Sequence, residues 1–412
     1  MSRDRLRRTR LGALAGALAL AVCASVGVAG AAERVPASSP SVPSSAVPST
    51  SGTGSAPATP GAGPSPSPSA SIGKGEGMLQ VLTFQGHVEY GGATLGADWV
   101  TPFEKLTGCR VARLDRVRTS AEMADRLRGT SYDVISPPPD LAGRLVADGT
   151  VKALDTTLLQ SYKDIPKRLR ELPALRSKDK VYGVPYLWGV NRVMYEGSAP
   201  EGADALYRTD QAAIRDSPLS IADAALALKE TRPELGVKDP FQLTPAQLDA
   251  AERLLAEHDG LGRVYWRSSL EVIQSFSTGA VRFAQALPYD LDLFRRAGRA
   301  VKEVDTGATT GWVDSWMLGA DAASPNCAYK WLDWMGSADV QRAAAAWTGL
   351  APANPHACDG GARHLCDIYH VRDDRRLKRV LFAARPTKDC GGLGGECTDY
   401  PEWEKRWKNL VK

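Results

Sequence analysis

A tryptophan and an aspartate two residues apart form the pair of side chains in this sequence best suited to hold a cation. Trp312 and Asp314 lie in a stretch, residues 311–318, that has the pattern of a β-strand. Because side chains i and i+2 of a strand lie on one face, the indole and the carboxylate can contact the same ligand. A cation over the indole gains about 0.5–2 kcal/mol, and a carboxylate accepts charge-assisted hydrogen bonds. The structural alternative is a core role for Trp312 and a turn-capping role for Asp314.

Histidines and cysteines gather near the C-terminus, at positions His356, Cys358, His364, Cys366 and His370. Such a cluster could bind zinc. The H-x-C spacing is uncommon in structural zinc sites, however, and the export signal described below favours an oxidising compartment and disulfides. We therefore predict a disulfide between Cys358 and Cys366 and no metal site.

No known catalytic motif is recognisable in the sequence. Residues 390–397 are glycine-rich, but they lack the Lys-Ser/Thr pair of a phosphate-binding loop and are bracketed by two cysteines. No G-x-S-x-G or H-E-x-x-H motif occurs. Trp403 and Trp407, four residues apart on an expected helix, are interpreted as packing residues. We expect no enzymatic activity and no cofactor, and an exported hydrolase is the weaker alternative.

The N-terminus has the composition of an export signal. The first ten residues contain five arginines and one aspartate, and an apolar run over residues 11–32 follows. An Ala29-x-Ala31 pattern suits cleavage, yet the run is also about long enough to cross a bilayer uncut. Lipidation at Cys23 and a twin-arginine signal at Arg7-Arg8 are further alternatives. We expect residues 1–32 to be a signal peptide or signal anchor, and the rest of the chain to be extracytoplasmic.

Residues 33–77 are predicted to be a disordered tether. They are almost entirely Ser, Pro, Ala, Gly, Val and Thr, and they contain no aromatic residue. Such a segment cannot bury enough apolar surface to offset the entropy of ordering. A tether between a membrane signal and a globular body suits a protein that is held near a membrane.

The net charge of +4 comes from the signal. Without residues 1–32, 46 basic and 46 acidic side chains remain of the 51 and 47 in the chain. Because phosphate binding needs a basic surplus or stripe, we expect no nucleic-acid partner. We expect the protein to be a monomer.

Six cysteines follow Cys23, and an even number in an exported protein argues for disulfides. Six cysteines allow fifteen pairings. We favour the two local pairs, which are Cys358 with Cys366 and Cys390 with Cys397, and this leaves Cys109 with Cys327. Each short loop contributes roughly 2–3 kcal/mol in the chain-entropy treatment.

The chain from residue 78 onward alternates between strand-like and helix-like segments, which is the pattern of an α/β protein. Strands are expected over residues 79–84, 109–113, 132–136, 181–188, 190–195, 281–287 and 311–318. Helices are expected over residues 99–106, 120–128, 219–229, 245–258, 326–335, 338–348 and 401–411. A folded part of about 335 residues exceeds the size at which one core keeps growing, so two domains are expected.

Four segments, in their order and spacing, resemble bacterial ABC-transporter solute-binding proteins of the spermidine/putrescine type. These segments are ADWVTPFEKLTGCRV at 97–111, YD at 132–133, YGVPYLWG at 182–189, and GWVDS at 311–315 followed by MLGAD at 317–321. Their ordered conjunction extends from about Leu79 to Trp407. The resemblance implies a periplasmic-binding-protein-like fold of two α/β lobes, joined by several hinge crossings, with a ligand cleft between the lobes.

The resemblance also implies a domain division and a function. We expect lobe 1 to comprise residues 78–186 and 281–322, and lobe 2 to comprise residues 187–280 and 323–412. The protein would capture a small polyamine-like or other amine-bearing solute and deliver it to an ABC permease in the membrane. Another small solute, such as an amino acid or a sugar, and a sensory or surface role on the same fold are alternatives.

In polyamine binders of this type a Trp-x-Asp on the last strand near the hinge stacks on the ligand and pairs with an ammonium. Trp312 and Asp314 match that pattern. The aromatic positions of the first loop correspond to His87 and Tyr90, and Glu89 adds a carboxylate beside them. The resemblance therefore implies that these five residues bind the ligand.

Three further candidate ligand-binding residues mark departures from the polyamine binders. Asp140 follows two prolines where the family has a Ser/Tyr loop, and Ser217 and Ser220 stand where carboxylates read the second amine. A dication with only one or two matched carboxylates is poorly balanced on burial. A monoamine, an amino-acid-like solute or another polar solute therefore competes with a polyamine.

Overall fold

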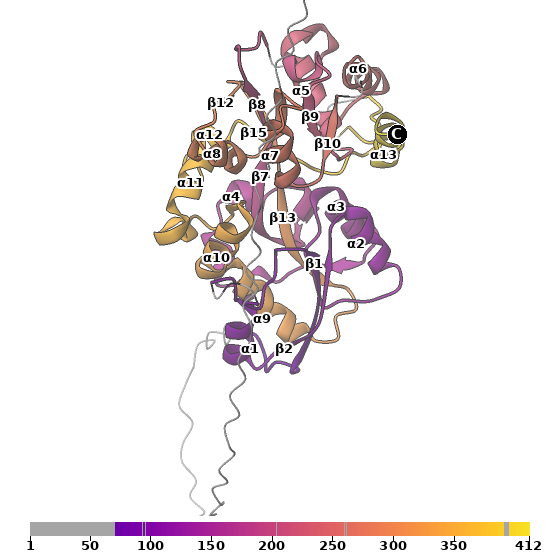
Figure 1. The fold of residues 1–412 in the computed structure, drawn as a ribbon. Coiled ribbons are helices and arrows are strands. Elements are labelled where there is room, and N and C mark those ends of the chain that lie inside the picture. The colour runs from indigo at the N-terminus through magenta and orange to yellow at the C-terminus, as the bar shows by residue number, and fades with distance from the viewer. Residues whose placement is uncertain are drawn as a thin grey trace, which may run out of the picture. The chain divides into compact units, whose positions relative to one another are not determined.

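Two β-sheets organise the chain (Figure 1). The computed structural model describes residues 71–412 except 93, 95, 203, 259, 261 and 391–394, so the signal and most of the predicted tether lie outside the described residues. The larger sheet has eight strands in the order β14-β7-β13-β3-β1-β2, with β4 and β15 also paired to β13. Its strands are β1 Met78–Phe84, β2 Arg110–Val117, β3 Val134–Ile135, β4 Val151–Lys152, β7 Gly183–Val190, β13 Thr309–Gly319, β14 Ala351–Pro352 and β15 Val380–Phe382.

The smaller sheet has five strands in the order β10-β9-β11-β8-β12. These strands are β8 Arg192–Glu196, β9 Ala212–Arg215, β10 Val264–Trp266, β11 Phe283–Ala286 and β12 Val301–Glu303. A separate pair consists of β5 Arg176–Ser177 and β6 Lys180–Val181. In the smaller sheet β9 is parallel to β10 and to β11, so these three strands end at the same edge.

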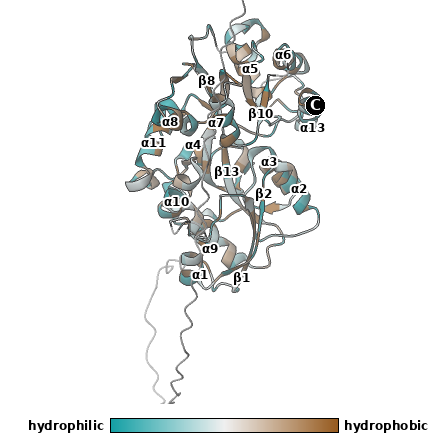
Figure 2. Cartoon of the chain, viewed as in Figure 1, coloured by the Kyte–Doolittle hydropathy of each residue, from teal (hydrophilic) through white to brown (hydrophobic). Residues whose placement is uncertain are grey.

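Helices pack around both sheets, as Figure 1 shows. The helices are α1 Val100–Thr107, α2 Ser120–Leu127, α3 Pro139–Ala147, α4 Lys167–Arg170, α5 Ser220–Thr231, α6 Pro245–Ala256, α7 Ser269–Ser277, α8 Pro288–Arg296, α9 Pro325–Gly336, α10 Ala338–Thr348, α11 Arg363–Tyr369, α12 Asp374–Leu377 and α13 Tyr400–Leu410. Figure 2 shows both hydrophilic and hydrophobic residues on helices such as α2 and α8, as expected of helices with one solvent-facing side. The predicted α/β fold is confirmed.

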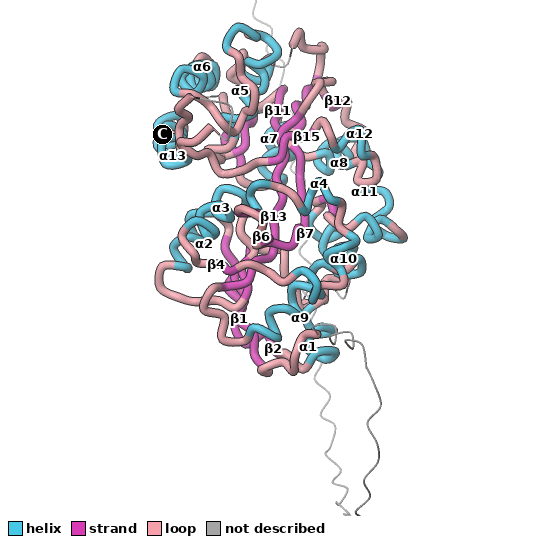
Figure 3. Tube along the Cα trace, turned by 180° about the vertical axis from the view of Figure 1, so that it is seen from behind, coloured by secondary structure: helices cyan, strands magenta, loops and turns pink. Residues whose placement is uncertain are grey.

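The chain crosses between the sheets where β7 and β13 lie side by side (Figure 3). Strand β7 belongs to the larger sheet, and after Asn191 the chain continues as β8 of the smaller sheet. It returns between β12 and β13, and it leaves the larger sheet again after β15 toward α13. All eleven residues of β13 are buried, so this strand is the central element of the molecule.

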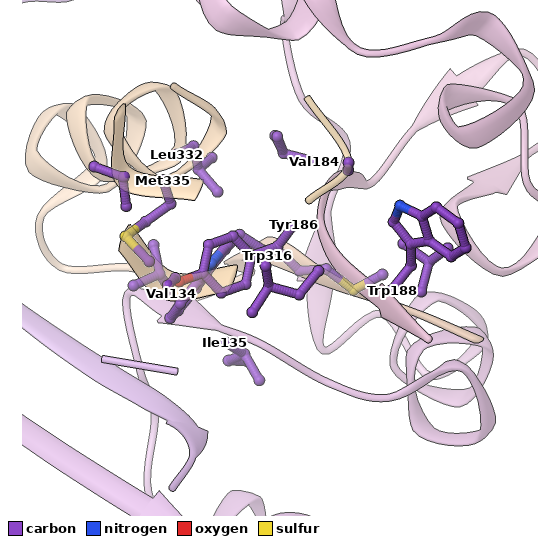
Figure 4. Close-up of a cluster of buried hydrophobic side chains, with 14 of the residues drawn as sticks. Val134, Ile135, Val184, Tyr186, Trp188, Trp316, Leu332 and Met335 are labelled. Carbon is purple, nitrogen blue, oxygen red and sulfur yellow. The ribbon is translucent and has the colours of Figure 1, made fainter. Parts of the chain in front are cut away.

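The core of the larger sheet is built around aromatic side chains from β7 and β13 (Figure 4). The ring centroids of Tyr186 and Trp316 are 5.8 Å apart, and those of Trp316 and Trp331 are 5.5 Å apart, both in edge-to-face arrangements. Leu332 and Met335 of α9 pack in the same cluster. This cluster fixes the backbone of β13 directly beside Asp314 and Ser315.

The placement of two regions differs from the expected lobe division. Strand β11 pairs with β8 and β9 in the smaller sheet, although residues 281–322 were expected in lobe 1. Helices α9 and α10 contribute to the core of the larger sheet, although residues 323–412 were expected in lobe 2. Local strand and helix patterns do not determine the sheet to which an element belongs, because long-range packing determines which strands pair. We propose that residues 192–308 with α13 form one lobe, and that the remaining described residues form the other.

The prolines after β3 begin a helix and do not form the expected loop. Pro138 precedes α3, and Pro139 is its first residue. Proline suits this position because its fixed φ matches a helix and the N–H it lacks would have no partner inside the helix. Asp140 therefore lies in the first helical turn. Strand β9 is an element that sequence reasoning missed, since Ala212-Ala-Ile-Arg215 is short and gives little alternation.

The end of the predicted tether is ordered, which corrects that part of the prediction. Oε1 of Glu76 accepts the N–H of Asn326 at 3.0 Å, and Oε2 accepts the N–H of Cys327 at 2.9 Å. The main-chain N–H of Gly73 donates to Oδ1 of Asn326 at 3.0 Å. Glu76 thus caps the first turn of α9, where free N–H groups and the helix dipole favour a carboxylate.

Replacing Glu76 with alanine is expected to lower the free energy of unfolding by about 1 kcal/mol, the usual cost of a lost helix cap. Burial raises the pKa of Glu76, but hydrogen bonds from Cys327 and Asn326 outweigh it, and the net pKa lies below its usual value of 4.5. The stabilisation is therefore present above pH 4.5 and lost as the pH falls through the folded-state pKa. Urea unfolding at pH 7 and pH 3 measures both effects, with Lys74→Ala as the matched control. Equal midpoints for Glu76→Ala and the unmodified protein at pH 7 would contradict the cap.

The structure contains the three predicted disulfides, which join Cys109 to Cys327, Cys358 to Cys366, and Cys390 to Cys397. The first one links the start of β2 to the start of α9 across 218 residues. Within the described part of the chain, no helix is both long and apolar enough to cross a membrane.

Candidate functional site

His87 and Asp314 approach each other at the carboxyl end of β1. His87 follows a turn in which Gly86 has a φ of 89°, a conformation that favours glycine. The hydroxyl of Tyr186 donates to the carbonyl of His87 at 2.9 Å and holds the loop against the core. Nε2 of His87 lies 3.7 Å from Oδ2 of Asp314, and both side chains are 6% exposed. Two predicted ligand-binding residues therefore meet in a buried position.

Burial decides the charge of this pair. Desolvation lowers the pKa of His87 to about 4, so its imidazole is neutral at pH 7. Desolvation raises the pKa of Asp314 to about 7; Arg215 and a hydrogen bond from Trp312 oppose this effect, and Asp140 adds to it. Burial therefore favours the protonated form of Asp314 over its carboxylate form. A cation placed beside it would favour the carboxylate form.

The Trp312 indole lies against the neighbouring strand β7. Its partner in the strand register is Gly189, and a Cβ at position 189 would lie 2.4 Å from the ring. Glycine thus leaves the room that the indole needs. The guanidinium carbon of Arg215 lies 4.0 Å from the centre of the indole ring, which is a cation–π distance. The cation over Trp312 in this structure is a side chain of the protein itself, and the predicted binding of a ligand cation by this indole stays a prediction.

Arg215 is the residue that sequence reasoning missed. It is the last residue of β9, at the edge where parallel strands of an α/β sheet place ligands. Its main-chain N–H donates to Oε1 of Gln285 at 2.9 Å, which fixes the strand end. Burial lowers the pKa of the guanidinium, while Asp314 and two other carboxylates raise it. The signal in the sequence is a charged residue that ends an otherwise apolar strand just before a helix.

Asp140 lies near this group and is already hydrogen-bonded. Its Oδ2 accepts from the hydroxyl of Ser120 at 2.5 Å, and it takes a further hydrogen bond from Tyr400. Its main-chain carbonyl accepts from Nη1 of Arg385 at 2.6 Å. Burial raises the pKa of Asp140, and these hydrogen bonds oppose the shift. Asp140 acts on Asp314 and Arg215 through its charge, and it links α3 to the C-terminal segment.

Tyr90 and Glu89 have interaction partners outside this group. The hydroxyl of Tyr90 donates to the carbonyl of Val111 at 3.3 Å, and Val111 pairs with Leu79 near the start of β1. The loop with His87 follows the other end of β1, about 16 Å away at the rise of a strand. The carboxylate of Glu89 lies 3.5 Å from Nη2 of Arg116. Neither side chain has a hydrogen bond or ion pair with Asp314 among the described residues, and their predicted role in ligand binding stays a prediction.

Ser217 and Ser220 support the start of α5. Oγ of Ser217 accepts from the N–H of Leu219 at 3.2 Å. The hydroxyl of Ser220, which is buried, donates to the carbonyl of Arg215 at 2.8 Å. Both serines thus satisfy the main chain next to Arg215, and their predicted role in ligand binding stays a prediction.

A second buried acid lies at the crossing between the sheets. Oδ1 of Asp223 accepts from the hydroxyl of Thr310 at 2.5 Å, and Nδ2 of Asn191 donates to that same hydroxyl oxygen at 2.7 Å. Desolvation raises the pKa of Asp223 to about 6. A cavity of about 30 Å³ adjoins these residues, too small for an organic solute.

A larger groove lies elsewhere on the molecule. It has a volume of about 660 Å³ and is lined by nine residues: Lys167, Arg168, Glu171, Leu172, Lys238, Asp239, Val380, Leu381 and Phe382. The charged groups in it are of both signs. It contains none of the predicted ligand-binding residues, and it is an alternative location for a bound ligand.

The histidines near the C-terminus take part in ion pairs and turns. Nε2 of His364 lies 2.9 Å from Oδ1 of Asp292, and His370 contacts Arg376. Cys358 and Cys366 are oxidised to a disulfide. Among the residues that the structure describes, no group of three His, Cys, Asp or Glu side chains is arranged to hold a metal ion.

Comparison with known proteins gives a family and a fold. The sequence profile described as "Bacterial extracellular solute-binding protein" matches residues 98–362. The spermidine/putrescine-binding protein PotD of Streptococcus pneumoniae has a similar structure, with a TM-score of 0.61, 15% identity, and coverage of 81% of this chain and 99% of that chain. A structure described as the "Atu4243-GABA receptor" has a TM-score of 0.60 at 17% identity, with coverage of 81% of this chain and 97% of that chain. MotA of A. tumefaciens B6, in complex with glucopine, has a TM-score of 0.57 at 16% identity, with coverage of 81% and 99%. At these identities the likeness shows the fold, and the matching profile covers more than half of the chain.

Proposed function

Because the chain belongs to the bacterial extracellular solute-binding protein family, we propose that it is the receptor of an ABC importer and holds one small amine-bearing solute between its sheets. In this proposal it delivers the solute to a membrane permease, acts as a monomer and catalyses no reaction. The export signal and tether would hold it at the outer face of the membrane. The solved relatives include proteins described for polyamines, for GABA and for glucopine, so the fold accepts several amine-bearing solutes.

The main support for this proposal is the position of two charged residues at one aromatic ring. Asp314 of the larger sheet and Arg215 of the smaller sheet approach the same indole, that of Trp312. Ligands of α/β proteins bind at the carboxyl ends of strands, and both β1 and β9 end here. A solute that contacts both sheets would favour the closed arrangement of the two lobes, and a permease can distinguish that arrangement from an open one.

A thermal-shift screen of the exported protein tests this function. Polyamines, amino acids, amines and small sugars are each added in excess, and the melting temperature is measured. At 100 times Kd a solute stabilises the folded state by about 2.7 kcal/mol, which raises the melting temperature by a few degrees. A shift with one solute class, confirmed by calorimetric titration at one site per chain, is the expected result. No shift with any class would contradict the proposed function.

The affinity for an amine-bearing solute is expected to rise with pH between 5 and 8. The ammonium needs the Asp314 carboxylate, whose pKa is about 7 without the solute. Affinity therefore falls about tenfold for each pH unit below 7 and is constant above 8. The neighbours of Asp314 are His87, Arg215 and Asp140; His87 stays neutral in this range, since its pKa is about 4. Calorimetric titration at pH 5, 6, 7 and 8 checks the slope, and a flat profile would exclude Asp314 as the ammonium partner.

Replacing Gly189 with alanine is expected to weaken solute binding about tenfold or more without removing any polar group. The new methyl group would overlap the Trp312 ring, and the indole must move away from Arg215. Calorimetry measures the affinity, and Gly197→Ala offers a control because a Cβ there meets nothing within 4 Å. Since Gly197 has a positive φ, the control is compared for affinity only and not for stability. Unchanged affinity in Gly189→Ala would show that the position of the indole does not matter for binding.

A further inference from the structure

The guanidinium of Arg215 lies over the indole of Trp312, on the ring that was predicted from the sequence to bind a ligand. Its central carbon lies 4.0 Å from the indole centre and 5.9 Å from that of Trp266. Two positive charges over one indole face repel each other. A dication at Asp314 would also bring a second positive charge close to Arg215, and like charges in a desolvated site cost free energy.

The nitrogen atoms of this guanidinium have no hydrogen-bond or ion-pair partner among the described residues, which distinguishes Arg215 from the arginines around it. Arg267, at the end of the neighbouring strand, lies 2.7 Å from the carboxylate of Asp216. Arg385 donates to the carbonyl of Asp140. Arg263 donates to main-chain carbonyls, including that of Tyr207 at 3.1 Å. Among the described residues, the guanidinium of Arg215 is held only by stacking on the indole.

Stacking leaves the donors of a guanidinium available. The five N–H groups lie in the plane of the group, whereas the indole contacts its face. An arginine fixed in this way presents a fork that matches a carboxylate with two parallel hydrogen bonds. Asp314, Asp223 and Asp140 act on Arg215 from beyond ion-pair distance, so they offset its charge without using its donors.

We propose that the solute is an amino-acid-like zwitterion, whose carboxylate binds Arg215 and whose ammonium binds Asp314. This inference rests on the proposed function and narrows its substrate class. The carboxylate of Asp314 on the larger sheet and the guanidinium of Arg215 on the smaller sheet then each pair with the oppositely charged end of one solute. Neither charge is left unpaired when the lobes enclose the solute, which a diamine could not achieve.

The test uses a series of four-carbon probes that differ only in their end groups: 4-aminobutanoate, 1,4-diaminobutane and butanedioate. The protein amino acids, spermidine and glucose are added to the series to cover other sizes. Calorimetric titration measures Kd for the unmodified protein and for Arg215→Gln, Arg215→Lys and the control Arg267→Gln. A zwitterion is expected to bind. Arg215→Gln should then weaken it about 100-fold, as expected when one partner of a buried charge pair is removed.

Arg215→Lys keeps the charge but loses the planar fork, so an intermediate loss is expected. Arg267→Gln should stay within about threefold, since that side chain is already paired and is 73% exposed. Binding of the amino acid and of its methyl ester can also be compared in the unmodified protein. This comparison tests the contact between the carboxylate and Arg215 even if Arg215→Gln fails to fold. The ester should lose binding by a similar factor.

Three results would overturn the inference while leaving the proposed function intact. These are binding of a diamine, polyamine or sugar in place of zwitterions, equal affinity for the acid and its ester, and unchanged affinity in a folded Arg215→Gln protein. Absence of binding by every probe and every screened solute would instead contradict the proposed function itself.

Discussion

Replacing Asp314 with asparagine is expected to weaken solute binding at least about 100-fold while making the protein more stable. The loss follows because asparagine keeps the shape of the side chain but cannot pair with an ammonium in a desolvated site. The gain follows from burial, which raises the pKa of Asp314 to about 7 from an ordinary value of 3.8. The folded state therefore binds a proton more tightly than the unfolded state, and stability is lost as the pH rises through 7.

The asparagine variant avoids that loss, so at pH 8 its free energy of unfolding should exceed that of the unmodified protein by roughly 2–4 kcal/mol. At pH 4 the two proteins should be equally stable. Urea unfolding at both pH values and calorimetric titration measure the two effects. Asp321→Asn, an exposed aspartate in the turn after β13, is the matched control and should change neither. A variant that binds normally, or that is less stable at pH 8, would contradict the role of Asp314 as a costly, ligand-binding carboxylate.

Removing the disulfide between Cys109 and Cys327 by a double alanine substitution is expected to lower the free energy of unfolding by about 5 kcal/mol. The bond closes a loop with a sequence separation of 218 residues, so it restricts the unfolded chain strongly. Both cysteines are fully buried, and their sulfur atoms connect β2 to α9 in the core of the larger sheet. Denaturant unfolding under oxidising conditions measures the change.

The disulfide between Cys390 and Cys397 supplies a matched comparison, since its sequence separation is only 7 residues. Its removal should cost about half as much, roughly 2–3 kcal/mol, by the same chain-entropy reasoning. Equal losses for the two double variants, or none for the long loop, would contradict the loop-length explanation.

The sequence predicted the elements of the fold better than their assembly. Helices such as α2 and α6 could be predicted because each has an amphipathic pattern and an N-cap residue. The hydroxyl oxygens of Thr119 and Thr244 accept main-chain N–H groups in the first turn. The sheet to which β11 belongs could not be predicted from the sequence. Its residues 283–286 pair with strands about 70–90 residues earlier, and no local pattern encodes such a pairing.

The difference between local patterns and long-range packing also explains which residues of the candidate site could be predicted. Trp312 and Asp314 could be predicted together because alternation along one strand places them on one face. The predicted role of Tyr90 in ligand binding stays a prediction, and in this structure its hydroxyl donates to the carbonyl of Val111, which pairs with Leu79 near the start of β1. Arg215 was missed because its importance comes from a contact with Trp312, 97 positions away in the chain, and becomes visible only when two sheets meet.

A crystal structure of the protein with the solute that gives the largest thermal shift is the decisive test of the proposed site. We expect one solute molecule in contact with residues of both sheets, with its ammonium at hydrogen-bond distance from Asp314 and its carboxylate at hydrogen-bond distance from Arg215. A solute bound in the groove lined by Lys167 and Lys238, or in contact with one sheet only, would contradict it.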